Sequence, residues 1–376
     1  VVDLVKNTAT EAVSALGDME KAQKQFQAST GASAVEMREY NSVMEKLHTN
    51  NYGEDINDIA QSMKNVKENI SGLNPEKLEE VTENAIAMRD VFDMDMNESI
   101  RGVNALMTHM GLEADEAFDL MAKGAQNGLD KTGELGDNLA EYAQIWAQAG
   151  FNAEEMFEIL DNGLQSGAYN LDKVNDFVKE FTISLSDGRI EENIGSFSDG
   201  TKILFNEWKQ GKVTTKDVFY SIITDLKNTT NQQEALTIAS NTWSSLGEDN
   251  AMSIITSLAD VNTAYDDVKG TMEEIKDIKY DTLESRMEQL GKKVQTEIAT
   301  PIMEDILPGI EAGVDTLIEH TDMIGPAAAT AAASFATFKV ASAAVTLMTT
   351  ATEGATVAQT IFNAVCNANP VVLVAT

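Results

Sequence analysis

The chain has 376 residues, of which 61 are acidic and 27 basic, so its formal net charge at pH 7 is −34. A charge of this sign repels the phosphates of DNA and argues against sequence-specific nucleic-acid binding, which gains affinity by releasing counterions. Five prolines and few aromatic residues argue against an all-β design, the single cysteine cannot form an internal disulfide, and three scattered histidines match no zinc motif. We therefore expect a mainly α-helical protein with no cofactor, either an elongated assembly or two to three domains.

Residues 1–73 carry a heptad pattern that predicts coiled-coil helices. Positions that alternate three and four apart from Val2 to Leu47 are apolar except at Gln23, Thr30 and Ser33. The last two of these exceptions flank Gly31, so we expect a break there. The same spacing resumes at Ile56, and that second apolar edge folds back on the first helix or faces another chain; the sequence leaves both open.

Residues 74–260 are predicted to form a helical core with an internal repeat. Asn74, Pro75 and Glu76 are typical of a helix start, with an N-cap followed by proline at the first helical position. The stretches Met110–Gly128 and Ala149–Gly167 then align without a gap at an offset of 39 residues, a period in the range of helical repeats. The matched residues that define the repeat are Gly111 and Gly150, Phe118 and Phe157, Gly124 and Gly163, and Gly128 and Gly167.

This pattern predicts a duplicated helical hairpin in which glycines end the helices and Phe118 and Phe157 are buried anchors. The simplest interpretation is a structural duplication without chemistry. A weaker third copy is suggested at Val213–Leu226, which lacks the flanking glycines. Between them, Phe181–Gly200 loses the helical period, and we expect a loop or short strands there.

Residues 261–325 are predicted to form a long charged helix, with Leu283, Met287, Leu290, Val294 and Ile298 on one stripe, and then a connector broken by prolines. Residues 326–376 are apolar and rich in small side chains, and their only charges are Lys339 and Glu353. The 13 uncharged residues between these two, which include Leu347, are fewer than the ~20 that a membrane span needs. The segment is either a buried helical hairpin or a membrane contact, and we expect the contact to involve Lys339, Leu347 and Glu353.

No catalytic motif is present: we find no HExxH, phosphate-binding loop, GxSxG, SxxK or paired CxxC. Asp93, Asp95 and Asn97 imitate the start of a calcium loop, but Glu98 stands where that loop needs glycine and Asn104 where it needs the closing glutamate. We therefore predict no catalytic, cofactor-binding or metal-binding residue and do not expect an enzyme.

Several stretches, taken together, resemble the phage tail tape measure protein family, in the form found in tailed phages and prophages of Gram-positive bacteria. They are FQASTGASAVEMREYNSVMEKLHTNNYGEDINDIAQSM, SIRGVNALMTHMGLEADEAFDLMAKGAQNGLD, GFNAEEMFEILDNGLQSGAYNLDKVNDFVKEF, NTWSSLGEDN and NANPVVLVA. They follow one another in consistent order from about Phe26 to the C-terminus, which makes the resemblance more specific than any single motif.

The resemblance implies a helical protein that lies in the lumen of the tail tube, sets the tube length during assembly and leaves ahead of DNA, with apolar segments engaging the host envelope. It implies as partners the tail tube protein, the tail assembly chaperones, baseplate or tail-tip proteins, further copies of the chain and the host membrane. The implied locations are the host cytoplasm during assembly, the virion tail and the host envelope on ejection. Family members often carry a peptidoglycan-cleaving domain; no motif for one occurs here, and we expect the chain to be a piece of a longer polypeptide.

A competing interpretation is a pore-forming or envelope-remodelling toxin, whose acidic helical body would mask the apolar tail. Gene context separates the two, because a tape measure gene lies beside tail tube and chaperone genes, and a toxin gene beside an immunity or secretion gene. A third interpretation, a muralytic enzyme, would need peptidoglycan cleavage by this chain alone.

Overall fold

The structure is a computed structural model that describes residues 17–247, 251–260, 263–282, 285–286, 288–289 and 292. Within these residues the regular structure is α-helix and short 3-10 helix, with no strand, which confirms the mainly α prediction. The start of the heptad, the predicted stripe from Leu283 to Ile298 and the whole apolar segment 326–376 lie outside the described residues.

The chain divides into two compact units: unit 1 comprises Val1–Gln61 with Thr282–Thr376, and unit 2 comprises Ser62–Asp281. Unit 1 contains a helix over residues 17–30, α2 (Ala34–Thr49) and the start of α3 (Ile56–Asn69). The Phe26 and Tyr40 rings lie edge to face with their centroids 5.5 Å apart, and Gly31 between the two helices has a φ of +68°. The break expected at Gly31 is therefore present, while a coiled-coil arrangement of these helices stays a prediction.

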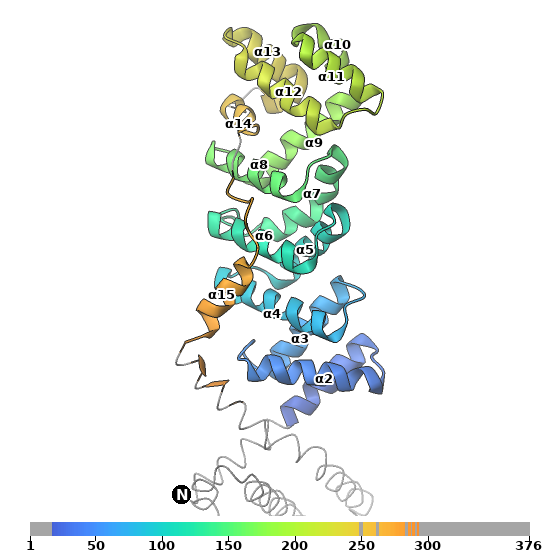
Figure 1. Ribbon diagram of the computed structural model, residues 1–376, viewed down its shortest axis with the longest axis vertical. Helices are drawn as coiled ribbons and strands as arrows, with labels where there is room; N and C mark the ends of the chain where they lie inside the picture. The colour runs from blue at the N-terminus through green and yellow to red at the C-terminus, as the bar shows by residue number, and fades with distance from the viewer. Residues whose placement is uncertain are drawn as a thin grey trace, which may run out of the picture. The chain divides into compact units, whose positions relative to one another are not determined.

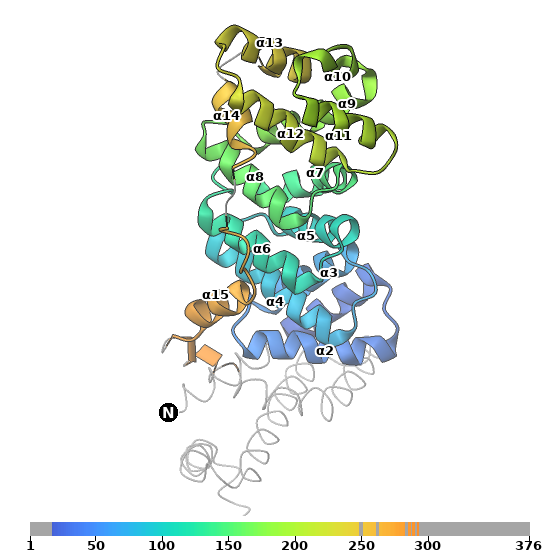
Figure 2. The same ribbon diagram turned by 45° about the horizontal axis from the view of Figure 1, so that its top comes forward.

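Unit 2 is a stack of helices. In chain order they are α4 (Pro75–Phe92), α5 (Met96–Met110), α6 (Ala114–Asn127), α7 (Leu135–Ala149), α8 (Ala153–Gln165), α9 (Leu171–Asp187), α10 (Arg189–Glu192), η1 (Ile194–Ser196), α11 (Asp199–Lys209), α12 (Thr215–Asn228), α13 (Gln232–Trp243), η2 (Ser244–Gly247), α14 (Ala251–Ser257) and α15 (Thr271–Tyr280). From α4 to α13 the chain climbs layer by layer, and then returns along one side (Figures 1 and 2). On that return α14 packs against α8 and α12, and α15 against α4 and α6.

Four junctions between described helices end in the same three-residue arrangement, which we call the corner: a glycine with positive φ, one further residue, and the N-cap of the next helix. The corners are Gly31-Ala32-Ser33, Gly72-Leu73-Asn74, Gly111-Leu112-Glu113 and Gly150-Phe151-Asn152, with glycine φ values of +68°, +79°, +78° and +94°. Only glycine adopts this conformation without strain, and the N-cap satisfies amide groups that the next helix leaves unpaired. At the last corner the Asn152 side chain accepts from the Glu155 N–H at 2.8 Å, and the Glu155 carboxylate accepts from the Asn152 N–H at 2.9 Å. This reciprocal pair is a capping box.

Glycines inside the helices let neighbouring layers approach closely. A Cβ placed on Gly136 of α7 would lie 2.7–2.8 Å from backbone atoms of Glu98 and Ser99 in α5. A Cβ on Gly124 of α6 would lie 2.8 Å from the Phe157 ring of α8. Small residues at these positions therefore set the distance between layers.

A buried polar link joins α7 to α9. The Trp146 indole N–H donates to the Asn175 side-chain oxygen at 2.8 Å, and the Asn175 amide donates to the Asn138 side-chain oxygen at 2.7 Å. All three side chains are almost completely buried. Because a buried polar group is costly without a partner, this chain of hydrogen bonds favours one registration of the two helices.

Two parts of unit 2 differ from the sequence-based expectation. The prediction of a loop or short strands for Phe181–Gly200 is wrong: α9 continues to Asp187 because Phe181 and Leu185 are buried, and α10, η1 and the start of α11 follow. Within the stretch 261–325, where we expect a long charged helix and a connector, residues 263–270 and 281–282 are non-helical and α15 lies between them, while the predicted stripe lies outside the described residues.

The glycine contacts predict the effect of adding one methyl group. Gly136→Ala should lower the free energy of unfolding by about 1–3 kcal/mol, because its Cβ meets backbone atoms that cannot rotate away. Gly200→Ala is the control: Gly200 also lies in a helix, but a Cβ there would meet only the Ser198 hydroxyl at an ordinary 3.7 Å, so alanine should match or exceed the wild type through its helix propensity. Urea denaturation measures both, and a Gly136→Ala variant as stable as Gly200→Ala would contradict the close contact of layers.

Candidate functional site: the charged surface of the helix-pair layers

The structure places the eight predicted repeat residues at three kinds of position. The first kind is a helix end with positive φ: Gly111 ends α5, Gly128 ends α6, Gly150 ends α7, and Gly167 follows the end of α8 with a φ of +102°. The second kind is a close contact within a helix, at Gly124 and Gly163. The third is the fully buried position of Phe118 and Phe157. For Gly163 the close neighbour is Val174 of α9, 2.5 Å from a Cβ built on the glycine. Each glycine is thus a helix end or a point where layers meet.

The repeat is longer than the sequence comparison indicated, because it includes the helix before each matched stretch. α5 and α7 both have 15 residues and begin 39 residues apart, at Met96 and Leu135. A further copy precedes them, since the corner glycine Gly72 lies 39 residues before Gly111 and α4 begins 39 residues before α6. The weak third copy suggested at Val213–Leu226 coincides with α12, whose Thr214 and Asp217 form a capping box and whose Phe219 is fully buried.

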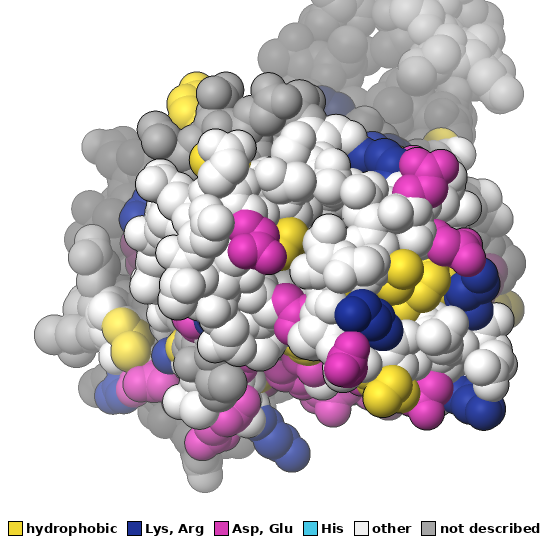
Figure 3. Space-filling view, turned by 90° about the horizontal axis from the view of Figure 1, so that it is seen from above, with side chains coloured by type: hydrophobic (Ala, Val, Ile, Leu, Met, Phe, Trp, Pro, Cys, Tyr) yellow, Lys and Arg dark blue, Asp and Glu magenta, His cyan; other side chains and the backbone are white. Residues whose placement is uncertain are grey.

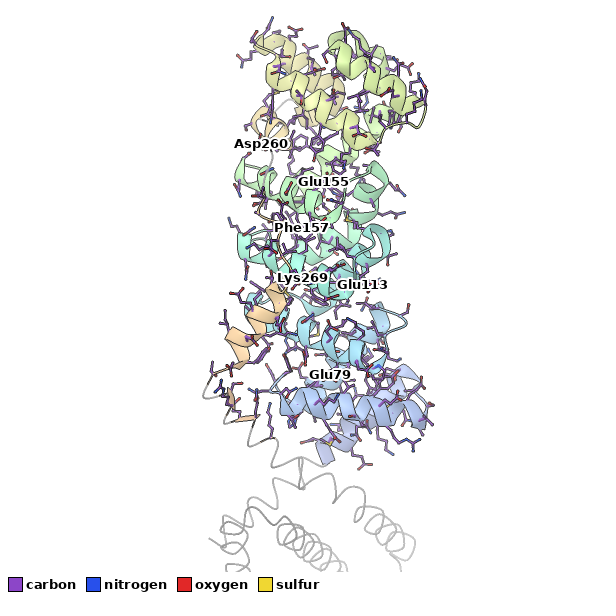
Figure 4. The ribbon with its side chains drawn as sticks, viewed as in Figure 1. Glu79, Glu113, Glu155, Phe157, Asp260 and Lys269 are labelled. Carbon is purple, nitrogen blue, oxygen red and sulfur yellow. The ribbon has the colours of Figure 1, made fainter. Side chains whose placement is uncertain are left out.

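The copy at α4 escaped the sequence comparison because its side chains have changed. Glu79 stands at the position of Phe118 and Phe157, and Ala85 at that of the helix glycines. Figure 4 shows Glu79 on α4, Glu113 at the N-cap of α6 and Glu155 in the first turn of α8. The corner glycine and cap were the signal that could have revealed this copy.

Charge is distributed unevenly along unit 2. Residues 90–172, which include the two repeat copies, carry 17 acidic and 3 basic side chains, and no Lys or Arg occurs from Thr132 to Asp172. Residues 189–243, which include α10–α13, carry 7 acidic and 6 basic side chains. The helix pairs are thus strongly acidic, while the last helices of the stack are nearly neutral.

The acidic side chains of the layers are close enough to affect one another. Burial, followed by the charges of Glu134 and Glu141, raises the pKa of Asp172. Burial, followed by the charge of Asp266, raises the pKa of Glu158. Both shifts favour the neutral form of the acid over the carboxylate. A nearby positive charge would offset them and stabilise the charged form.

At the α10–α13 end, acidic and basic side chains lie side by side with small apolar patches between them (Figure 3). Lys209 and Glu191 approach to 2.5 Å, and Lys202 and Asp199 to 3.2 Å. Exposed pairs of this kind contribute little stability, at most about 1 kcal/mol each. This end therefore offers a mixed, hydrogen-bonding surface without a dominant sign of charge.

The acidic residues that imitate a calcium loop have structural roles. Asp93 ends α4 in the left-handed conformation, and the Asp95 side chain caps α5 by accepting from the Glu98 N–H at 2.9 Å. Among the described residues, no group of three His, Cys, Asp or Glu side chains could hold a metal ion. In the same part of the chain, no helix is both long and apolar enough to cross a bilayer. Lys339, Leu347 and Glu353 lie outside it.

Comparison with known families decides the broad identity. The model of the family described as phage-related minor tail protein matches residues 48–304, which is 257 of the 376 residues and includes all of unit 2. The chain belongs to the phage-related minor tail protein family. No curated protein and no solved structure matches significantly. As a minor tail protein, the chain has a role in the phage tail, is located in the virion tail and interacts with other tail components. The layered helix pairs of unit 2 therefore lie within the part of the chain that the family model matches.

The packing of the minor tail protein's repeat predicts which aromatic side chains matter. Phe118→Ala and Phe157→Ala should each lower the free energy of unfolding by about 3–5 kcal/mol, because a fully buried ring is replaced by a cavity. Tyr169→Ala is the matched control, since Tyr169 is 90% exposed and its loss should change stability by less than about 0.5 kcal/mol. Thermal unfolding that does not distinguish the three variants would contradict the packed repeat.

Proposed function

We propose that this minor tail protein is the tape measure of its tail, the template that sets the length of the tail tube during assembly. The observation that carries the proposal is the 39-residue repeat of helix pairs in a chain of the tail family. A ruler needs a length that grows in proportion to the chain, and stacked repeats provide this because each contacts mainly its neighbours. The resemblance in sequence to tape measure proteins supports the same function.

The charge of the layers supports a position in the tube lumen. DNA passes through the tube. Residues 90–172 carry 17 acidic and 3 basic side chains, and of the acidic ones only Asp119 and Asp161 are buried, so the surface of the layers repels phosphates. On this proposal the chain lies in the lumen until it leaves ahead of DNA, without binding the nucleic acid that follows it.

The partners on this proposal are the tail tube protein, the tail assembly chaperones, baseplate or tail-tip proteins and further copies of the chain. The nearly neutral α10–α13 end, with its mixed charges and apolar patches, suits contact with another tail protein better than the acidic layers do. The proposed function is structural, with no catalytic residue assigned.

Deletion of one repeat tests the ruler. Removing Gly111–Ala149 joins α5 directly to the corner Gly150-Phe151-Asn152, so one layer is lost while the corner is retained. A fully extended helix of 39 residues spans about 60 Å, from a rise of ~1.5 Å per residue. Because the layers are folded pairs, we expect phage with the deletion to have tails shortened by less than about 60 Å, measured by electron microscopy.

Duplication of Gly111–Ala149 is the matched control and should lengthen tails by the same amount. A shortening of the full 60 Å would mean that the repeat is stretched in the tail. Unchanged tail length with lost infectivity would move the role of the repeat from length to assembly or ejection. Unchanged length and infectivity in both variants would refute the tape measure function of this region.

We further propose that residues 326–376 engage the host membrane after release. These 51 residues contain two charges of opposite sign, and all of the net charge of −34 belongs to the residues before them. On a helix Lys339 and Glu353 would lie about 21 Å apart along the axis, at the two edges of a thin or tilted insertion.

The membrane proposal predicts that the Pro326–Thr376 peptide releases dye from liposomes at micromolar concentration. A peptide carrying Ala344→Asp and Leu347→Asp should be much less active, because charges at the centre of an inserted helix are costly. A wild-type peptide that neither binds nor permeabilises the vesicles would assign the segment to internal helical packing.

A further inference from the structure

The return segment of unit 2, residues 263–281, lies across the second helices of three layers. Figures 1 and 2 show it running beside α8 and α6 to α4, after α14. It starts from a fixed point: the Asp260 carbonyl accepts from the Asn162 amide at 2.9 Å, and the Asp260 carboxylate pairs with Lys227 at 2.6 Å. We call residues 263–281 the brace.

The brace contacts each layer in turn. The buried Tyr265 ring packs against Phe157 of α8 with centroids 5.6 Å apart. Polar contacts join α15 to α6 and α4: Asp119 of α6 binds the start of α15, and α4 contributes two acidic residues. Lys276 pairs with Glu83 at 3.2 Å, and the Tyr280 hydroxyl donates to Asp90 at 3.1 Å.

Asp119 is the anchor because α15 has no N-cap side chain of its own. The N-cap position is Gly270, with a φ of +83°. The two Asp119 carboxylate oxygens accept from the Gly270 and Met272 N–H groups, both at 2.7 Å. The carboxylate is buried, with 7% of the residue exposed, and faces the positive end of the helix dipole. A residue 151 positions away in the chain thus replaces the missing cap.

Besides Asp119, α15 is held by two buried apolar side chains and by two polar contacts to α4. It has ten residues, which is too short to be stable alone in water. Its buried apolar side chains are Met272 and Ile275, whereas Ile278 is 72% exposed. The Lys276 to Glu83 pair loses part of its benefit to burial, which raises the pKa of Glu83. Docking and helix formation are therefore coupled, and both depend on the Asp119 contact.

We propose that α15, the last part of the brace, is a latch that opens as a unit, unfolding and leaving α4 and α6, while Tyr265 stays packed on α8 and α4–α13 stay folded. Closed, it ties α4 to α6 through contacts far apart in the sequence. Open, it leaves each layer held by its neighbours alone, and such a stack unwinds one repeat at a time. The latch follows from the contacts of unit 2 and holds whether or not the chain is a tape measure.

Hydrogen exchange of the full chain, read by mass spectrometry, tests the latch. In the wild type, amides of α15 should exchange faster than those of α6 and α8, because the latch opens without them. Asp119→Asn keeps the side-chain shape but loses the charge and one acceptor, so α15 exchange should rise about tenfold, the effect of losing one helix cap. Protection of α6 and α8 should change far less. Asp115→Asn is the control, because Asp115 lies exposed on the same helix.

Lys276→Gln provides a second variant that leaves the buried carboxylate in place, should Asp119→Asn impair folding. Its α15 exchange should rise about threefold, as expected for one partly buried ion pair, with α6 and α8 again protected. Trypsin gives an independent readout, since cleavage after Lys276 in Asp119→Asn should be faster than in Asp115→Asn. Equal exchange rates of α15, α6 and α8 in the wild type, a parallel rise of all three in the variants, or no rise in α15 would each overturn the latch.

Discussion

Unit 2 depends on its corners, where the chain turns and the next helix begins within three residues. A glycine with positive φ ends one helix, and the N-cap two residues later satisfies the first amides of the next. When the same corner recurs at Gly72, Gly111 and Gly150, every 39 residues, each pair of helices leaves its corner in the same way. Equivalent faces then meet at each interface, which is why glycines and phenylalanines recur at matched positions.

The interface between α5 and α7 shows that small residues determine how closely two layers pack. Gly102 and Gly136 face one another between α5 and α7, and each lacks room for a methyl group. Closely approaching backbones gain dispersion contacts along their length, which is the advantage of dense packing. The penalty is that helix glycines carry a propensity cost of roughly 1 kcal/mol each relative to alanine. Their presence inside α5 and α7 indicates that packing between layers outweighs the intrinsic stability of single helices.

The sequence predicted features that are encoded locally. Helical class, the start of α4 at Pro75, the break at Gly31 and the buried positions of Phe118 and Phe157 all follow from periodicity and capping residues near each site. Features held by distant contacts were missed. Nothing near Gly270 indicates a helix start there, because the capping carboxylate belongs to Asp119.

The two other misses have similar causes. The lost helical period after Phe181 suggested a loop or short strands, but tertiary burial of Phe181 and Leu185 extends α9 to Asp187. The copy at α4 was hidden because two anchor positions had changed, to Glu79 and Ala85, while the backbone corner was kept. The acidic character of the candidate site was evident from the composition. The fall in the excess of acidic side chains toward α10–α13 could be interpreted only once the order of the layers was known.

The hydrogen-bonded link from Trp146 through Asn175 to Asn138 contains no ionisable group. The link itself therefore has no group to titrate and no charge for salt to screen, whereas charged side chains lie beside it between the same two helices: burial and the charges of Glu134 and Glu141 raise the pKa of Asp172, and the Lys179 ammonium lies over the Tyr142 ring. Ionic strength therefore acts differently on the neutral link and on the carboxylates: added salt weakens the repulsion between the carboxylates and leaves the hydrogen bonds of the link unaffected. The neutral link can thus hold α7 and α9 in register while pH and salt change how strongly the charged exterior repels its surroundings.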